Sequence, residues 1–157
     1  MRAKRLIAAT VMLSLFGTLQ AADKSPGQIL GGKPASSSVS SGRYYDGKGS
    51  SAGRAAQSGS STRLYDAKGS YVGSVDAAKD STRVYNGNGS YAGRTQTSGK
   101  NTSFYDSKGA FNGRSTTSGD STRYYDSKGA YSGRSTTSGN TTRFYDAQGR
   151  YSGSKTK

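Results

Sequence analysis

Nine arginines recur in two columns at a spacing of 20 residues, each close to a tyrosine in the sequence. One column holds Arg43, Arg63, Arg83, Arg123 and Arg143, and the other holds Arg54, Arg94, Arg114 and Arg134. The planar guanidinium group donates paired hydrogen bonds that match the geometry of phosphate, sulfate and carboxylate groups. A repetitive anionic ligand would fit these repeated columns.

Tyrosines keep the same spacing beside these arginines. Those that we expect to contribute to binding are Tyr65, Tyr71, Tyr85, Tyr91, Tyr105, Tyr125, Tyr131, Tyr145 and Tyr151. Their rings can stack on sugars, on nucleic-acid bases or on an arginine side chain. Two interpretations stay open, because the arginines either contact a ligand or stack on the tyrosines within the sheet.

The residue types of most catalytic and metal sites are missing. The chain has no His, no Cys and no Glu, so the usual general bases, nucleophile partners and transition-metal ligands are absent. The turn aspartates come one per hairpin, whereas a calcium loop brings several oxygens onto one ion. No phosphate-binding GxxxxGKS or GxxxxGKT loop occurs. We therefore expect a protein that is not an enzyme and that holds no metal or cofactor.

The element that positions these residues is a 20-residue phrase repeated six times from Ser41 onward. Repetition at a fixed period is typical of array architectures. Tyr holds the fifth place of every copy, and Gly holds the ninth and the thirteenth. The stretch from Thr122 to Arg134 reads as β-favouring residues, a turn of Asp-Ser-Lys-Gly and a second short run. This pattern predicts strand, turn and strand in each copy.

The turn has a mechanism at its first and last residues. Asp126 is expected to accept hydrogen bonds from nearby backbone amides. Gly129 is expected to take the left-handed conformation that closes a three-residue hairpin loop with a bulge. In the second copy, Lys79 stands where other copies have Gly between hairpins, which predicts an irregular return turn.

Strand alternation then assigns the side chains to two faces. The turn places Tyr125 opposite Tyr131 and Arg123 opposite Gly133, all on one face. The other face carries an apolar column that we expect to fill the core, formed by Tyr44, Leu64, Val84, Phe104, Tyr124 and Phe144.

A lone hairpin would not persist in water, because cross-strand aromatic pairs contribute only about 0.2–1 kcal/mol each. Neighbouring hairpins must therefore pack together. We expect an all-β array of six hairpin repeats over residues 42–157, arranged as a solenoid or as a single curved meander sheet. The sequence leaves open whether the 12 strands close into a barrel.

The repeat resembles those of two known families. The run GNTTRFYDAQGRY from Gly139 to Tyr151 resembles the YD repeat of Rhs and teneurin-type proteins, whose phrase is Tyr-Asp-x-x-Gly-Arg-Leu. The run YYDSKGAY from Tyr124 to Tyr131 looks like the choline- and glucan-binding cell-wall repeat, in which stacked hairpins form a solenoid. Only the last copy has Arg150 after its glycine, and the chain lacks the Trp on which the cell-wall family relies. Both resemblances imply β-hairpin repeats.

The first residues are typical of a bacterial export signal. Residues 1–5 carry three positive charges, residues 6–19 are mostly apolar, and small residues follow at Ala21 and Ala22. The apolar stretch is shorter than the ~20 residues of a spanning helix. We expect a signal peptide at residues 1–21, a disordered linker rich in Ser, Gly and Pro at 22–41, and a periplasmic or extracellular product.

The net charge indicates the class of partner. The formal charge is +14, and +11 remains once the three cations of the signal are removed. Such an excess either attracts acidic glycans, lipopolysaccharide or nucleic acid, or keeps a tyrosine-rich array soluble. We hypothesise a non-enzymatic exported protein that binds anionic envelope or matrix polymers. The alternative is a self-assembling fibre or matrix subunit, because stacked identical side chains and open strand edges favour end-to-end growth.

Overall fold

The computed structural model describes residues 41–157, which fold into 12 β-strands. Their bounds are β1 Gly42–Asp46, β2 Ser51–Ser58, β3 Ser61–Asp66, β4 Tyr71–Ala77, β5 Ser81–Asn86, β6 Tyr91–Ser98, β7 Asn101–Asp106, β8 Phe111–Ser118, β9 Ser121–Tyr125, β10 Tyr131–Ser138, β11 Thr141–Asp146 and β12 Tyr151–Thr156. This part of the chain contains no helix long and apolar enough to cross a membrane. The signal peptide expected at 1–21, and all but the last residue of the linker expected at 22–41, lie outside the described residues.

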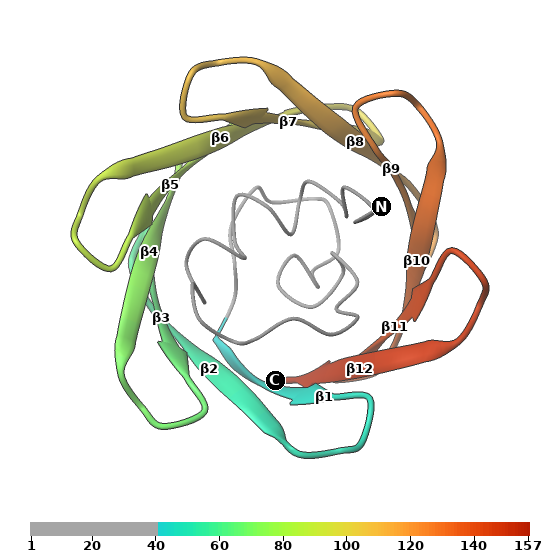
Figure 1. Ribbon diagram of the computed structural model, residues 1–157, viewed down its shortest axis with the longest axis horizontal. Helices are drawn as coiled ribbons and strands as arrows, with labels where there is room; N and C mark the ends of the chain where they lie inside the picture. Colours follow the sequence, from blue (N-terminus) through green and yellow to red (C-terminus); the bar gives the residue numbers. More distant parts are fainter. Residues whose placement is uncertain (1–40) are drawn as a thin grey trace, which may run out of the picture.

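The strands form one antiparallel meander that closes on itself (Figure 1). Each strand pairs with its neighbours in the sequence, and β1 pairs with β12 to complete the barrel. The joining ladder runs from Arg43 opposite Thr156 to Asp46 opposite Gly153. The prediction of an all-β hairpin array is confirmed. Of the two arrangements expected first, residues 41–157 adopt the curved meander sheet and not a solenoid.

Each hairpin loop is closed by the side chain of the first residue in that loop. In the fifth copy, Asp126 Oδ1 accepts hydrogen bonds from the backbone N–H groups of Lys128 and Ala130, both at 2.9 Å. The N–H of Gly129 donates to the Asp126 carbonyl at 3.0 Å, and Gly129 has a φ of 82°. The other copies repeat these bonds, with Asn86 as the acceptor in the third. The predicted turn is confirmed, and its loops flare outward from the wall (Figure 1).

A β-bulge shifts the register of every hairpin. In the fourth copy, Asn112 is the extra residue on β8, just before Gly113. Gly113 has a φ of 134°, and a Cβ added there would lie only 2.5 Å from the carbonyl oxygen of Tyr125 on the next hairpin. Because a bulge increases the local twist of a sheet, six bulges at equal spacing supply the curvature that closure requires.

This bulge overturns one expected pairing. Tyr125 lies opposite Tyr131, as expected. Arg123 does not lie opposite Gly133, because the extra residue before the glycine moves the glycine one position along β9. Arg123 instead lies opposite Arg134. Plain alternation on both strands misses this shift, which places two arginines face to face on the outer wall.

Tight turns reverse the chain at the other rim. In the third copy, Gly99 takes a φ of 58°, and the N–H of Thr97 donates to the carbonyl of Asp80 in the preceding turn at 2.7 Å. Equivalent bonds link the later turns. In the second copy, β4 ends at Ala77, one residue earlier than its equivalents, and the chain bends through Lys79. The predicted irregular turn at Lys79 is confirmed.

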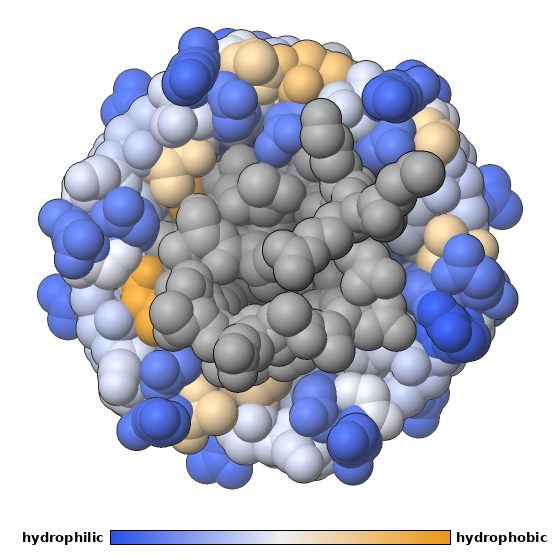
Figure 2. All heavy atoms as spheres, in the orientation of Figure 1, coloured by the Kyte–Doolittle hydropathy of each residue, from blue (hydrophilic) through white to orange (hydrophobic). Residues whose placement is uncertain are grey.

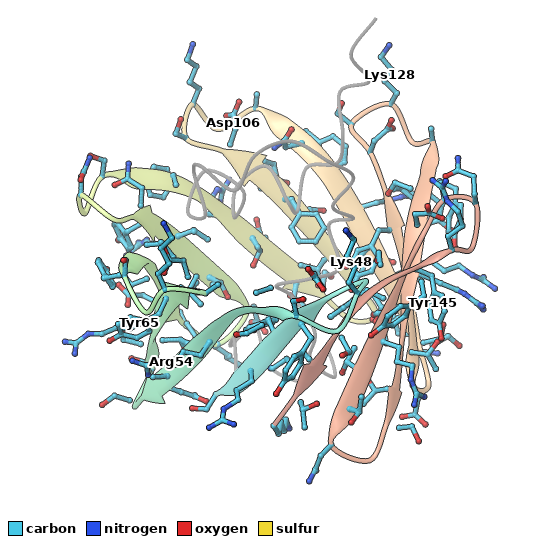
Figure 3. All side chains as sticks on the ribbon, turned by 60° about the horizontal axis from the view of Figure 1, so that its bottom comes forward. Lys48, Arg54, Tyr65, Asp106, Lys128 and Tyr145 are labelled. Atoms are coloured by element: carbon cyan, nitrogen blue, oxygen red, sulfur yellow. The ribbon has the colours of Figure 1, made fainter. Side chains whose placement is uncertain are left out.

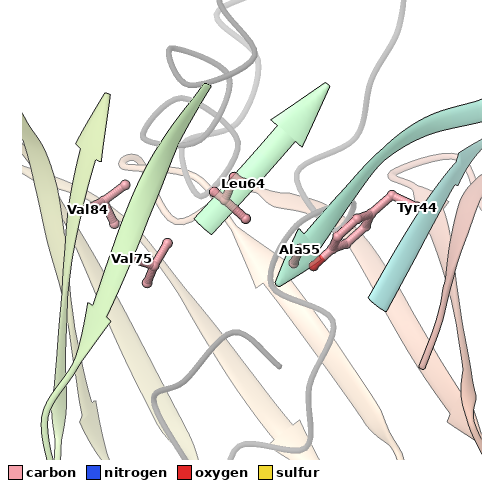
Figure 4. Packing of buried hydrophobic residues seen from close by; sticks show 5 residues of the cluster. All are labelled: Tyr44, Ala55, Leu64, Val75 and Val84. Carbon is pink, nitrogen blue, oxygen red and sulfur yellow. The ribbon is translucent and has the colours of Figure 1, made fainter. Parts of the chain in front are cut away.

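The inner wall holds the expected apolar column. Its six members are at most 3% exposed: Tyr44, Leu64, Val84, Phe104, Tyr124 and Phe144. Side chains from neighbouring strands complete part of this packing, as Figure 4 shows for Ala55 beside Tyr44 and for Val75 beside Val84. The column therefore packs inside the barrel, and the arginine and tyrosine columns lie on the outside. In a view down the barrel axis, hydrophilic residues gather around the outer edge of the rim (Figure 2).

Two exceptions to the repeat complement each other at the seam between β12 and β1. The first copy has Gly42 where the other copies have Thr, and the last copy has Lys155 where the others have Ala, Val, Thr or Ser. A Cβ added to Gly42 would lie 2.7 Å from Lys155 Cε, so the glycine makes room for the lysine. Lys155 is 2% exposed, with its Nζ 5.8 Å from the centre of the Tyr44 ring. Burial, helped by the nearby charge of Lys157, lowers the pKa of Lys155 to about 8.

Replacing Gly113 with Ala should destabilise the barrel by about 2–4 kcal/mol, because the new Cβ meets the neighbouring backbone and the φ suits only glycine. Gly47→Ala is the matched control, since a Cβ at Gly47 meets nothing closer than 3.5 Å and its φ is not positive. Urea unfolding measures both free energies. Equal stability of the two variants would contradict the role given to the bulge.

The free energy of unfolding should rise with pH as the buried Lys155 loses its proton. An unfolded lysine has a pKa of about 10.4, whereas the folded value is about 8. Between these values the unfolded state binds more protons, so stability increases by up to about 1.4 kcal/mol per pH unit. Urea unfolding from about pH 7.5 to 9.5, below the usual tyrosine pKa, measures the slope. Lys155→Met should abolish the rise, and a flat wild-type profile would show that the ammonium is not buried.

Candidate functional site

Both arginine columns lie on the outer wall of the barrel. The third-place arginines come from odd-numbered strands and the fourteenth-place arginines from even-numbered strands. All nine are exposed: Arg43, Arg54, Arg63, Arg83, Arg94, Arg114, Arg123, Arg134 and Arg143. Their immediate neighbours along each strand are mostly buried, as alternation of side chains requires. The structure thus brings the expected arginines onto one continuous face.

Four of these arginines stack on a tyrosine of the following hairpin. Arg54 lies directly opposite Tyr65 in the β2–β3 ladder, and its Cζ is 4.0 Å from the centre of the ring (Figure 3). The equivalent contacts are Arg94 on Tyr105 at 4.6 Å, Arg114 on Tyr125 at 5.2 Å and Arg134 on Tyr145 at 5.0 Å. Stacking uses the flat face of the guanidinium, while its N–H groups point sideways in the plane. An arginine can therefore stack on a ring and still donate hydrogen bonds to an anion.

A second ring packs edge-on against five of the fifth-place tyrosines. The ring centres are 6.1–6.2 Å apart and the planes meet at 70–75°. The pairs are Tyr65–Tyr71, Tyr85–Tyr91, Tyr105–Phe111, Tyr125–Tyr131 and Tyr145–Tyr151. The eleventh-place rings are 39–45% exposed. The expected tyrosines therefore line the same outer wall as the arginines, with a part of each pair open to solvent.

Alternate hairpins place two arginines directly opposite each other. The pairs are Arg43–Arg54, Arg83–Arg94 and Arg123–Arg134. In the other three hairpins, a serine holds one of the two places, as where Arg63 faces Ser74. Like charges that face each other across a sheet destabilise it. Among residues 41–157, no carboxylate forms an ion pair with any of the nine arginines.

Most aspartates of the described chain lie at the two sets of turns (Figure 3, which labels Asp106). Asp76 on β4 is the exception, and it lies directly opposite Arg83 on β5.

In the last loop, Arg150 Nε donates to Asp146 Oδ2 at 2.7 Å. Partial burial opposes ionisation of Asp146, but the hydrogen bonds and charge of Arg150 outweigh it and lower the pKa of the carboxyl group. Residues 41–157 contain no group of three His, Cys, Asp or Glu side chains that could hold a metal ion.

The inner wall offers hydroxyl groups in place of charges, apart from Lys155. The Tyr124 hydroxyl lies 3.0 Å from Ser135 Oγ. Burial raises the pKa of Tyr124 to about 12, and this hydrogen bond only partly opposes the shift. Ser132 Oγ, on a bulge, is buried without a hydrogen-bond partner among the described residues. Among residues 41–157, the Tyr124 and Ser135 hydroxyls thus pair with each other, whereas Ser132 only fills space.

Comparison with known proteins adds no functional assignment, since the chain matches no protein-family model and no curated protein sequence. Functional inference therefore rests on the chemistry of the outer wall.

Two residues of this wall were missed by the sequence analysis. Tyr45 and Lys157 lie beside Arg43 and Arg54 at the seam. Tyr45 is a member of the fifth-place column, but its first-copy neighbour in the eleventh place is Ser51 and not an aromatic residue. The departures from the repeat in the first and last copies could have pointed to these residues, because closure of the barrel brings those two copies together.

The stack between Arg54 and Tyr65 should contribute a coupling energy of about 0.5–1 kcal/mol. A double-mutant cycle with Arg54→Ser and Tyr65→Leu, measured by urea unfolding, tests this value. The matched control is the cycle of Arg63→Ser with Tyr65→Leu, because Arg63 lies on the same strand without stacking on that ring. The Arg54–Tyr65 coupling energy should exceed the Arg63–Tyr65 coupling energy. Equal values would mean that a nearby positive charge, and not the stacked geometry, accounts for the coupling with Tyr65.

Proposed function

We propose that this protein is a non-enzymatic exported binder of anionic polymers, which it engages through the arginines and tyrosines of the outer wall. The polymers of this class are acidic glycans, lipopolysaccharide and nucleic acid. The observation that carries the proposal is the set of nine exposed arginines without an ion-paired carboxylate among residues 41–157. Their planar donors match the oxygens of phosphate, sulfate and carboxylate groups.

The facing arginine pairs support a role outside the fold. Arg123 opposite Arg134 places two positive charges side by side, at a cost to the sheet. The barrel does not need both residues, because Ser103 and Ser154 stand at such places in neighbouring copies with the same register. A bound anion between the two guanidinium groups would offset their repulsion. The pairs therefore favour an anionic ligand over a purely structural role.

The proposed export rests on the sequence alone. Residues 1–21 have the layout of a signal peptide. A periplasmic or extracellular protein would meet the acidic polymers of a bacterial envelope or matrix. The two resemblances to YD repeats and to cell-wall-binding repeats agree with an exported hairpin array and name no ligand.

The rival hypothesis is self-assembly into fibres. It rests on stacked identical side chains and on open strand edges, and in the barrel the edges of β1 and β12 pair with each other. Fibre growth along the sheet would therefore require the ring to open at this ladder or another. Electron microscopy of the purified protein separates the hypotheses, since the binder should remain a discrete particle.

Replacing Arg123, Arg134 and Arg143 together with Ser should reduce the slope of log affinity against log salt by about 2–3, near one unit per lost ionic contact. Binding is measured for heparin, polygalacturonate and single-stranded DNA, because the proposal covers the whole class. A wild-type protein that binds none of them would contradict the proposal.

The matched control removes the same charge from the hairpin loops, by replacing Lys48, Lys108 and Lys128 with Ser. These ammonium groups stand on loops that flare away from the wall, as Figure 3 shows for Lys48 and Lys128, and match no planar acceptor. The slope should change by less than about 1 in this variant. Equal slopes in the two triple variants would mean that net charge alone governs binding.

A further inference from the structure

The outer wall changes at the seam where β12 meets β1. Tyr65, Tyr105, Tyr125 and Tyr145 each carry both an arginine and a second ring. Tyr85 has the second ring alone, because Ser74 faces it where the other copies place an arginine. Tyr45 has neither contact among the described residues, since Ser51 replaces the ring and Ser154 faces it in the place of the arginine. Its ring is the one of the six with both neighbours missing.

A shallow depression of about 380 Å³ lies beside this ring. Its lining includes Arg43, Tyr45, Arg54, Thr156 and Lys157, and it contains no acidic residue. Arg43 on β1 lies opposite Arg54 on β2 and opposite Thr156 on β12. The two guanidinium groups are therefore carried by neighbouring strands. The depression thus combines three positively charged side chains, two hydroxyl groups and one ring on which no side chain of residues 41–157 is stacked. Its volume falls within the range of small-molecule sites, roughly 300–1,000 Å³.

We propose that this seam depression is a subsite for a sugar residue that carries a carboxylate, namely a uronic acid of an acidic glycan. The inference rests on the proposed function and names where on the wall, and by what chemistry, one unit of the polymer is held. The ring of Tyr45 supplies a flat apolar surface for the C–H face of the sugar. The carboxylate is attached to that same sugar ring, which brings it within reach of Arg43 and Arg54 as paired donors. Lys157 adds a third positive charge, and Thr156 supplies a hydroxyl for the sugar hydroxyls.

A glycan fits these observations better than a nucleic acid. Proteins that hold single strands stack successive bases on a series of open rings. Here the other fifth-place rings already pack against Tyr or Phe, and four of them also lie under an arginine. The lining also lacks Asn, Gln and acidic side chains, which read the edges of adenine and cytosine. One ring that neither an arginine nor a second ring of residues 41–157 contacts, beside three cationic side chains, suits one charged sugar.

The barrel itself provides the sharpest test. Ser154→Arg places an arginine opposite Tyr45, where four other copies have their stacked arginine, and so covers the ring while adding a positive charge. The probe is trigalacturonate, measured by titration calorimetry on the purified protein with uncharged galactotriose as the reference. We expect Ser154→Arg to weaken trigalacturonate about tenfold, the scale of one lost aromatic stack. Simple charge attraction predicts the opposite, a tighter complex.

Two further variants complete the experiment. Ser74→Arg adds the same charge opposite Tyr85, away from the seam, and should leave the affinity for trigalacturonate within about twofold of the wild type. Tyr45→Ala removes the ring and should weaken binding about tenfold without changing the charge. Thermal unfolding confirms that each variant is folded. Ser154→Arg copies an arrangement the barrel already contains, so it keeps the test valid even if Tyr45→Ala does not fold.

The outcomes separate this site from the wider function. Unchanged or tighter trigalacturonate binding by Ser154→Arg would overturn the seam site, as would the absence of any binding by the wild type. Tighter binding of a mononucleotide such as AMP than of trigalacturonate would overturn the assignment to a glycan. Polygalacturonate binding, measured on the same proteins, should persist in Ser154→Arg through the other arginines. A wild-type protein that binds none of the polymers would instead contradict the proposed function.

Discussion

The close approach of two backbones at the thirteenth-place glycine is the constraint on which the rest of the structure depends. At Gly113 there is no room for a side chain, because the carbonyl oxygen of Tyr125 on the next hairpin occupies that space. The bulge formed there adds one residue to the second strand of each hairpin and increases its twist. Repeated six times, the same local kink turns a flat meander into a ring. It also shifts the register so that arginine faces arginine across three of the hairpins.

The two faces of the sheet then hold the hairpins together by different means. Inside, an apolar column from Tyr44 to Phe144 is withdrawn from water. Outside, an arginine on the second strand of one hairpin lies over a tyrosine on the first strand of the next, as Arg54 does over Tyr65. The aromatic pair lies within one hairpin, whereas the arginine stack bridges two. Four of the nine arginines that give the surface its charge thus also join neighbouring repeats.

The parts that sequence could predict are those determined within a few residues. Asp126 and Gly129 specify their turn by local hydrogen bonds and backbone conformation, and the pairing of Tyr125 with Tyr131 follows directly from that turn. The position of Gly133 could not be obtained by counting, because a bulge looks like ordinary alternation until both strands are paired. Closure was also out of reach, since it depends on twist summed over 12 strands. The seam exceptions Gly42 and Lys155 were visible in the sequence, but their relation appears only when the first and last strands meet.

The ladder between β1 and β12 has the same antiparallel character as the ladders elsewhere in the ring. For the backbone, the point at which the chain enters the circle is therefore arbitrary, and a circular permutant opened at another return turn would trace the same wall. A gain or loss of one whole copy would change the circumference by two strands and leave the height unaltered. In a fibre or a solenoid, duplication of a repeat lengthens the molecule. Here it would widen the ring and alter the curvature of the surface on which the arginine rows lie.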